Sequence, residues 1–475
     1  MSNRRETSND VSKFSSNDYK MIWSPQALSN ALNIDVHPEI YCGQVQFNSN
    51  DVLPGDLFIA LQGNSDGHNY VPDALARGAS AVIVSRMIAD IEPNRMILVP
   101  DTLAALNQLA EYKRTHSKAK FIGVTGSSGK TSTKEAIRTV LSRFGQTFAS
   151  RGNFNNHLGV PLNLASMPDN TEYAVIEMGM NHEGEIRQLT KMVKPDIALI
   201  TTIAEAHLQF FSSMLHLTDA KCEIFEGLPK DGAAVINFDN SYYDRMLQNL
   251  HKLNINNIYS FGKSPKAQSR LISYEPIGDK VRLFYSILDE EIAIEMPFIP
   301  EHYARNYTAV LTIASILKLD ISIAAQQLST IPLTIGRGLL INARRTGHNY
   351  QIIADYYNSN PESLNASLEY LKLLSSRKKV AIIGDMLELG ENSRILHERL
   401  VPAIIASGAQ SVFLVGDNTK YIYELLPLEI QKRHFDNVTS LIDNINELLQ
   451  GNELILIKGS RGIKLDKIIL SFEVL

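Results

Sequence analysis

The chain has 475 residues, too many for one hydrophobic core, so two to four domains are expected. Its 46 lysine and arginine residues nearly balance 51 aspartate and glutamate residues, which gives a net charge of −5. Because no long block carries a single sign, composition gives no support for binding to nucleic acid or to an anionic membrane.

The N-terminal end of the sequence is polar. Residues 1–20 lack an apolar core, so we expect a disordered lead-in rather than a secretory signal or a membrane anchor. No apolar run approaches the roughly 18 residues of a membrane helix. Two cysteines, Cys42 and Cys222, are too few for a disulfide framework and suit a reducing compartment. We therefore predict a soluble cytoplasmic protein.

Short apolar segments dominate residues 40–110. The segments "DLFIAL", "AVIVS" and "RMILVP" predict strands and Pro72–Gly78 predicts a helix, which together indicate a small mixed α/β domain. The charged stretch "EYKRTHSKAK" at 111–120 follows. It could be a basic patch, but its pattern favours a solvated helix end and a linker.

A phosphate-binding loop is predicted next, in the segment "GVTGSSGKTSTKEAI". A buried strand is expected at Phe121–Val124 and a helix at Lys130–Leu141. Between them, Gly126 and Gly129 allow the backbone N–H groups to face an anion at the helix N-terminus. The Lys130 ammonium would meet the outer phosphates of a nucleotide, and a hydroxyl from the next residue would bind Mg²⁺.

From Phe121 to about Asp320, strands such as "YAVIEMG" and "DIALITTI" alternate with helical segments, which predicts a parallel sheet with helices on both faces. Functional side chains are expected beyond the carboxyl ends of these strands. Glu177, His207, Lys221 and Glu223 occur there. Each alone fits an ordinary structural role, but together they offer the ligands of a two-metal site.

A third region begins after "PLTIGRG" at 332–338. Its strands "QIIADY", "KVAIIGD", "SVFLVG" and "ELILIKG" alternate with helices, so a second open α/β sheet is predicted.

Several stretches resemble one family. The compact loop "TGSSGKT", with Val124 at the position of the usual first glycine, is similar to that of the ATP-dependent Mur ligases and their folylpolyglutamate synthetase relatives. Eight further stretches fit in order, and the resemblance covers about residue 40 to the end: "NFNNHLGVP", "EMGMNHEGEI", "AHL", "DAKCEIFEGL", "INFDN", "DYYNSNPES", "GDMLELGENS" and "IKGSRG".

The resemblance implies an α/β protein of three domains. After the lead-in, a UDP-sugar-binding domain would span 21–112, a central parallel-sheet P-loop ATPase domain 113–331, and a Rossmann-like domain for the amine substrate 332–475. The implied reaction is ATP-dependent amide formation through an acyl phosphate. "DYYNSNPES" and "GDMLELG" resemble the members that join D-alanyl-D-alanine to a UDP-N-acetylmuramoyl tripeptide. A monomer is expected.

The resemblance also implies roles for particular residues. The catalytic set would be Lys130, His207, Lys221 and Arg337, with Lys221 carbamylated by carbon dioxide. Two Mg²⁺ ions would be held by Thr131, Glu177, His207 and the Lys221 carbamate. ATP would be bound by Thr125, Gly126, Ser127, Ser128, Gly129, Lys130, Thr131, Ser132, Asn237, Asn306, Arg337 and Asp355.

The two remaining substrates have implied sites as well. Ser49, Asn155 and Asn156 would bind the UDP-sugar. Asn358, Lys458 and Arg461 would bind the dipeptide. The two cations follow a strand, where they could meet the carboxylate of the dipeptide; two solvated loop charges are the alternative.

The sequence departs from the family at a few positions. The usual "DSR" is Asn48-Ser49-Asn50, so an arginine contact to the UDP-sugar is missing. In the "GxHNxxN" stretch, Glu301 and Tyr303 replace glycine and asparagine while His302 and Asn306 remain, and Thr202 replaces an expected asparagine. These departures affect the UDP-sugar pocket more than the catalytic centre.

Three alternatives stay open. The preceding ligase of the family, which adds a third, diamino acid residue, would be expected to carry a "DNPR"-like stretch that is missing here. A folylpolyglutamate synthetase would lack the "PGDLFIAL" and "DGH" region. A non-catalytic nucleotide-binding switch would have no need for a second metal site.

Overall fold

The computed structural model of the chain describes residues 21–475 except residues 207, 333–334 and 375–376. The predicted lead-in at 1–20 and the predicted metal ligand His207 lie outside the described residues. The chain divides into two compact units, one of residues up to 119 with 158–171 and one of 120–157 with 172–475. The predicted domain boundaries at 112/113 and 331/332 stay predictions.

The first unit contains a four-stranded parallel sheet in the order β1-β2-β3-β4, in which β2, β3 and β4 occur where strands were expected and β1 was not predicted. The stretch 111–120 forms the end of a helix and a short connection, but Lys113 within it is buried and donates to the carbonyl of Ile22 (2.8 Å). The elements are β1 Val45–Gln46, β2 Leu57–Ile59, β3 Ala81–Val84, β4 Met96–Leu98, α1 Pro25–Leu32, α2 Val71–Ala76, α3 Thr102–His116 and α5 Gly159–Ala165.

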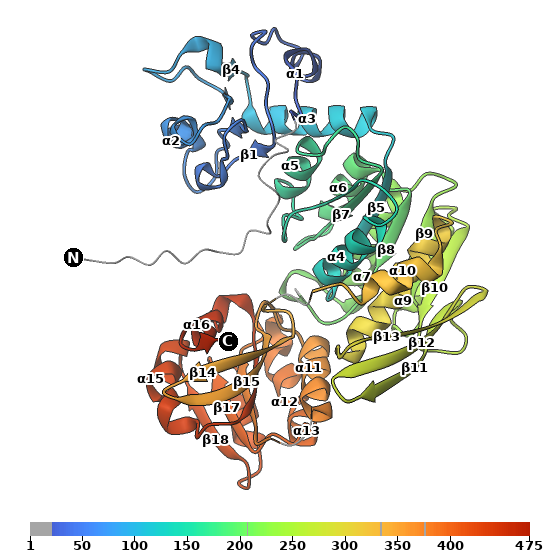
Figure 1. Ribbon diagram of the computed structural model, residues 1–475, viewed down its shortest axis with the longest axis vertical. Coiled ribbons are helices and arrows are strands. Elements are labelled where there is room, and N and C mark those ends of the chain that lie inside the picture. Colours follow the sequence, from blue (N-terminus) through green and yellow to red (C-terminus); the bar gives the residue numbers. More distant parts are fainter. Residues whose placement is uncertain (1–20, 207, 333–334, 375–376) are drawn as a thin grey trace. The chain divides into compact units, whose positions relative to one another are not determined.

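The second unit contains two sheets, of which the first has nine strands in the order β13-β12-β11-β10-β9-β8-β5-β7-β6 (Figure 1). The strands from β6 to β11 are parallel, as predicted. Their bounds are β5 Lys120–Thr125, β6 Thr147–Ala149, β7 Tyr173–Glu177, β8 Ile197–Ile200, β9 Ala233–Asn237, β10 Asn257–Gly262 and β11 Ser269–Ile277.

Helices cover both faces of this sheet. Ile122 and Val124 of β5 share a core with α4, α9 and α10, while Phe121, which alternates with them along the strand, is also fully buried. The helices are α4 Lys130–Leu141, α6 Glu185–Val193, α7 Met214–Cys222, α8 Tyr243–Lys252, α9 Glu301–Ile316 and α10 Ile321–Leu328.

The edge of the nine-stranded sheet differs from the prediction. Strands β12 Lys280–Ile287 and β13 Glu290–Pro297 pair antiparallel with β11 and with each other. Two-residue connections join these strands, and such short turns can link only antiparallel neighbours. The first turn contains Gly278 with φ +62°, a conformation that glycine adopts without strain. Residues 269–297 therefore extend the parallel sheet by a β-meander.

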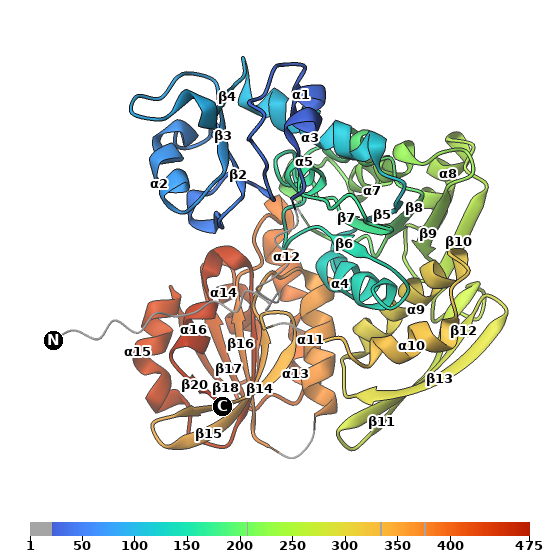
Figure 2. The same ribbon diagram turned by 45° about the horizontal axis from the view of Figure 1, so that its top comes forward.

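The second sheet of this unit has seven strands in the order β18-β17-β16-β19-β15-β14-β20 (Figure 2). Strands β18 to β15 are parallel, as the Rossmann-like prediction requires, and β14 and β20 add an antiparallel edge. The bounds are β14 Leu339–Arg345, β15 His348–Asp355, β16 Lys379–Gly384, β17 Ser411–Val415, β18 Gln431–Phe435, β19 Leu454–Lys458 and β20 Glu473–Val474.

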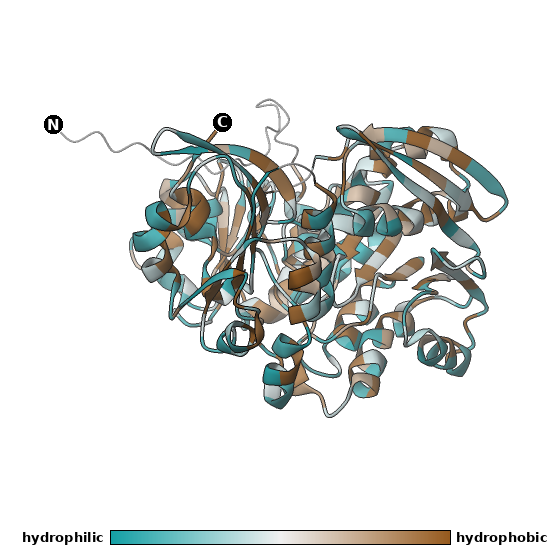
Figure 3. Cartoon of the chain, turned by 90° about the horizontal axis from the view of Figure 1, so that it is seen from below, coloured by the Kyte–Doolittle hydropathy of each residue, from teal (hydrophilic) through white to brown (hydrophobic). Residues whose placement is uncertain are grey.

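Separate apolar cores cover the two faces of the seven-stranded sheet. One includes α15 and α16, and the other includes α11 to α14. Figure 3 shows hydrophobic residues concentrated along the inner strands. In the described part of the chain, no helix is both long and apolar enough to cross a membrane. The helices are α11 Pro361–Leu373, α12 Ser393–Glu398, α13 Val401–Ala406, α14 Lys420–Leu425, α15 Val438–Leu448 and α16 Asp466–Leu470.

Candidate active site

The loop between β5 and α4 is held against the end of β8. The Thr201 hydroxyl donates to the carbonyl oxygen of Ser128 (2.6 Å). A Cβ atom at Gly126 would lie 2.0 Å from Thr201 Oγ1, so this close approach requires glycine. Gly129 has φ +77° and immediately precedes α4. The loop thus leads directly into the positive end of a helix dipole, which favours a bound anion.

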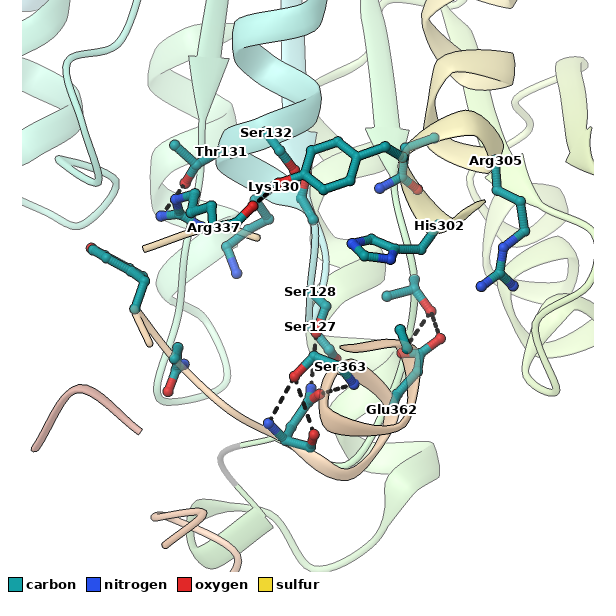
Figure 4. A pocket seen from close by; sticks show the side chains of 18 of the residues that line it. Ser127, Ser128, Lys130, Thr131, Ser132, His302, Arg305, Arg337, Glu362 and Ser363 are labelled. Carbon is teal, nitrogen blue, oxygen red and sulfur yellow. Dashed lines mark hydrogen bonds between the residues drawn. The ribbon is translucent and has the colours of Figure 1, made fainter. Parts of the chain in front are cut away.

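A pair of oxygen ligands lies beside the loop. The Thr131 hydroxyl donates to Glu177 Oε2 (2.8 Å), and Asn155 Nδ2 donates to Glu177 Oε1 (2.7 Å). Arg337 Nη2 donates to Thr131 Oγ1 (3.1 Å), as Figure 4 shows. A hydroxyl and a carboxylate are hard oxygen ligands within reach of one ion, so the residues present fit Mg²⁺.

Two lysines line the same cavity as this oxygen pair. The Lys130 ammonium donates to the carbonyl of Gly126 (2.8 Å), and burial lowers its pKa although the charge of Glu177 opposes this change. Lys221 on α7 is 2 % exposed, and burial, helped by the charge of Lys130, lowers its pKa well below the ordinary value. Within the described part of the chain, the Lys221 ammonium has no hydrogen bond or ion pair. A neutral amine reacts with carbon dioxide, so this environment fits a carbamate.

The predicted nucleotide residues lie around the same loop. A Cβ atom at Gly129 would lie only 2.7 Å from Asn306 Nδ2, so the Asn306 side chain lies against the loop. Asn237 Nδ2 donates to the carbonyl of Thr201 (3.2 Å). Asp355 Oδ2 accepts from Ser367 Oγ (2.6 Å).

The residues that depart from the family pattern have partners. Glu301 forms an ion pair with Lys263 (2.6 Å), and the Tyr303 hydroxyl donates to the backbone carbonyl of Arg337. Between them, His302 is half-buried, and desolvation lowers its pKa to about 4. This imidazole is therefore neutral near pH 7.

Most of the predicted site residues line one cavity of about 950 Å³ within the second unit. They lie in the parts of the chain that surround both sheets of this unit, and Figure 4 shows side chains that line this cavity, among them Lys130, Thr131 and Arg337. The lining includes Ser127, Ser128, Gly129, Lys130, Thr131, Ser132, Asn155, Asn156, Glu177, Lys221, Asn237, Asn306, Arg337, Asp355, Asn358 and Lys458.

Other predicted residues lie elsewhere. Thr125 is fully buried, and its hydroxyl has no hydrogen-bond partner among the residues that the structure describes. Ser49 is in the first unit, where it begins the short helix Ser49–Asp51 and is 5 % exposed. The arginine that the "DSR" position lacks is replaced by Asn50, which accepts from Arg77 Nη2 (3.1 Å). The predicted roles of Ser49 and His207 stay predictions.

The two predicted dipeptide cations have different surroundings. Lys458 is 2 % exposed and pairs with Asp355 (2.8 Å), so it is not a solvated loop charge. Arg461 lines a smaller cavity of about 230 Å³, where its Nη1 donates to Tyr357 Oη (3.3 Å). Asn358 lines both cavities.

Sequence reasoning missed two residues at the start of α11. Asn360 caps this helix through Oδ1 and donates through Nδ2 to Ser128 Oγ of the phosphate loop (3.0 Å). Glu362 accepts from the Thr202 hydroxyl (3.1 Å). The letters "NPES" are a helix N-terminus signature, with asparagine as the cap and proline at the first position, and could have identified this end of the helix.

Comparisons with known proteins agree with this geometry. Residues 124–314 match the model of the Mur ligase middle domain, and residues 341–461 match that of the Mur ligase glutamate ligase domain. A UDP-N-acetylmuramoyl-tripeptide–D-alanyl-D-alanine ligase of Rickettsia prowazekii (strain Madrid E) is 54% identical over 449 residues, which are 94% of this chain and 99% of the relative.

The structure is also similar to solved structures of MurF ligases. The crystal structure I of MurF from Acinetobacter baumannii has a TM-score of 0.82 at 29% identity and covers 94% of this chain and 98% of that chain. The MurF ligase of Thermotoga maritima, in complex with ADP, has a TM-score of 0.75 at 27% identity and covers 90% of this chain and 96% of that chain.

Proposed function

Because this chain belongs to the Mur ligase family, we propose that it is an ATP-dependent amide ligase that joins D-alanyl-D-alanine to a UDP-N-acetylmuramoyl tripeptide. The observation that carries this proposal is the 54% identity, over nearly the full length of both chains, to a ligase named for that reaction. The cavity beside the phosphate loop supports it, because it offers cations, hard oxygens and room for a nucleotide.

The reaction needs ATP because a carboxylate has no leaving group that an amine can displace at neutral pH. The tripeptide carboxylate attacks the γ-phosphorus of ATP, the bond to ADP breaks, and an acyl phosphate forms. The amine of the dipeptide then attacks the acyl carbon, and the tetrahedral intermediate collapses to an amide, phosphate and a proton. Two anions must approach each other in the first step, so charge neutralisation is the main task of the protein.

The residues of this chain divide that task. Lys130 and Arg337 place positive charge beside the phosphate loop, where Arg337 already contacts Thr131 (3.1 Å). Thr131 and Glu177 would hold one Mg²⁺ ion, and His207 with Lys221 a second. Bound Mg²⁺ would neutralise charge on the phosphates and the carboxylate. Exclusion of water from the cavity would protect the acyl phosphate from hydrolysis.

We propose that Lys221 acts as a carbamate. Its neutral amine would attack carbon dioxide and lose a proton, which replaces a potential cation by an anion with two oxygen atoms. An anion of this kind suits a hard metal, whereas an ammonium would repel it. The burial of Lys221 and the lowered pKa of its amine support this assignment.

The product of the reaction tests the proposal. Purified protein incubated with Mg²⁺, ATP, the tripeptide nucleotide and D-alanyl-D-alanine should form one new compound, with the summed mass of the two substrates less one water. One ADP should appear for each amide bond. If a UDP-N-acetylmuramoyl dipeptide and a free diamino acid gave the only product, the preceding ligase of the family would be the correct assignment.

Arg461 is the proposed contact for the carboxylate of the dipeptide. Its guanidinium lies over the Tyr357 ring at 5.3 Å, which holds it in the smaller cavity. Arg461→Ala should raise the KM for D-alanyl-D-alanine about tenfold or more and change the KM for ATP little, because a charge-assisted hydrogen bond to one substrate is lost. Steady-state kinetics measure this, with the exposed Lys467→Ala as a control. An unchanged KM for D-alanyl-D-alanine would show that Arg461 does not bind the carboxylate of the dipeptide.

We also propose a cytoplasmic location and a monomeric state. Both cysteines are free and buried, as a reducing compartment allows. The nucleotide substrates of the proposed reaction are likewise those of a cytoplasmic step.

A further inference from the structure

Lys134 is a buried cation that the proposed chemistry does not use. It lies one helical turn after Thr131 on α4, and its side chain is fully buried. Its ammonium donates to the carbonyls of Ser150 (2.5 Å) and Gly152 (3.0 Å) and pairs with Glu135 Oε1 (3.0 Å). An ammonium has three N–H donors, so all of them are satisfied. Lysine is rarely buried to this extent, because desolvation of a charge is costly unless each donor has a partner.

The segment that receives Lys134 also holds Glu177. Ser150 accepts from the Glu177 N–H through Oγ (3.0 Å), while its carbonyl accepts from Lys134. Five residues further along, Asn155 Nδ2 donates to Glu177 Oε1 (2.7 Å), and the carbonyl of Asn155 accepts from the Gly179 N–H (2.8 Å). Residues 150–155 thus contact both the backbone and the carboxylate at the end of β7.

The contacts form a closed ring. α4 supplies Lys134 to the segment 150–155, this segment holds the Glu177 carboxylate, and Glu177 Oε2 accepts from Thr131 Oγ1 (2.8 Å) on α4. One turn of helix therefore fixes the distance between the lysine that anchors the segment and the hydroxyl that meets the carboxylate. The two oxygens proposed as Mg²⁺ ligands are set relative to each other from both sides.

We propose that Lys134 is a positioning residue, which anchors residues 150–155 so that Asn155 orients the Glu177 carboxylate toward the phosphate-loop hydroxyl and the metal. This inference rests on the proposed function, because it concerns the same metal site. Groups that orient a metal ligand typically change metal affinity about 10- to 100-fold when they are removed. A purely structural lysine would affect stability without affecting the metal.

The test measures binding and needs no turnover. The affinity for a non-hydrolysable ATP analogue is measured by calorimetry with Mg²⁺ and with EDTA, for the unmodified protein and for Lys134→Met. In Lys134→Met, we expect the dissociation constant with Mg²⁺ to rise about tenfold and the constant with EDTA to change by less than about twofold. Equal changes under both conditions, or no change, would overturn the proposal.

A matched control is available in the first unit. Lys113 is also buried, at 5 % exposed, and donates to the carbonyl of Ile22 (2.8 Å) and to Asp169. Lys113→Met removes the same kind of contact, so it should lower the thermal midpoint while the ratio of the two dissociation constants stays unchanged. A changed ratio in this control would assign the effect to lost stability and overturn the positioning role.

Hydrogen exchange gives an independent readout. Backbone amides of residues 150–156 should exchange faster in Lys134→Met than in the unmodified protein, and Lys113→Met should not alter their exchange rates.

If Lys134→Met does not fold, a second variant tests the same proposal. Asn155→Ala removes the direct contact with Glu177 and should produce the same selective loss of affinity with Mg²⁺. An unaltered ratio in Asn155→Ala would overturn the proposal. A failure of the ligase reaction in the unmodified protein would instead contradict the proposed function, because the binding test does not depend on it.

Discussion

Lys221→Ala should lower the turnover number on the order of a thousandfold, because the proposed carbamate supplies negative charge where the reacting groups and the metal meet. The side chain is buried on α7, and its pKa is lowered well below the ordinary value by burial and by the charge of Lys130. A lowered pKa favours the neutral amine, which is the form that reacts with carbon dioxide. Initial rates of phosphate release, with both substrates saturating, measure the loss.

Small carboxylates distinguish a carbamate from other roles of Lys221. In Lys221→Ala, formate or acetate can occupy the vacated space and should restore part of the activity. Lys221→Met fills the same space with an uncharged chain of similar length, so it should be equally inactive and should not respond. If Lys221→Ala were as active as the unmodified protein, the carbamate would be refuted. A lack of recovery with small carboxylates would leave the carbamate without support.

Lys130→Met should be the second severe variant, with a loss of turnover of about 10²- to 10³-fold, because a point charge beside the transferred phosphoryl group is removed. In the structure, the ammonium donates to the carbonyl of Gly126 (2.8 Å) at the start of the loop that it would share with the phosphates. The loop itself is held by Thr201, so the fold should persist. Single-turnover phosphate release measures the chemical step.

The control for this variant lies on β5, the strand that precedes the phosphate loop. Lys120 is exposed and pairs with Asp196 (3.2 Å), and an exposed ion pair contributes at most about 1 kcal/mol. Lys120→Met should therefore retain nearly full turnover. If Lys130→Met kept the single-turnover rate of the unmodified protein, Lys130 would not take part in phosphoryl transfer.

The sequence predicted the parts of the fold whose signal is local. The strand, glycine turn and helix from 120 to 141 follow from an apolar run and from two glycines, and they occur where expected. Strands β16, β17 and β19 of the C-terminal sheet are mostly apolar runs, which are typical of strands buried on both faces. The β-meander at 269–297 departs from the predicted alternation of parallel strands and helices, because two-residue turns join its strands as antiparallel neighbours.

The parts of the site that lie at the ends of adjacent parallel strands could be predicted. The loop residues and Glu177 meet because the carboxyl ends of parallel strands lie at one edge of the sheet. Contacts between distant segments could not be predicted. The ion pair of Lys458 with Asp355 and the contact of Asn360 with Ser128 join residues about 100 and 230 positions apart, and no local pattern encodes such pairs. Lys134 resembles a surface lysine in the sequence, and only the packing of α4 shows that it is buried.

The dependence of phosphate release on both substrates tests the central claim most directly. With Mg²⁺ and ATP present, we expect rapid phosphate release when a UDP-N-acetylmuramoyl tripeptide and D-alanyl-D-alanine are supplied together, and only a background rate when either one is omitted. This coupling follows because the tripeptide supplies the carboxylate that is phosphorylated and the dipeptide supplies the amine that completes the reaction. Phosphate release with a free diamino acid and a dipeptide nucleotide, but none with D-alanyl-D-alanine, would contradict the account.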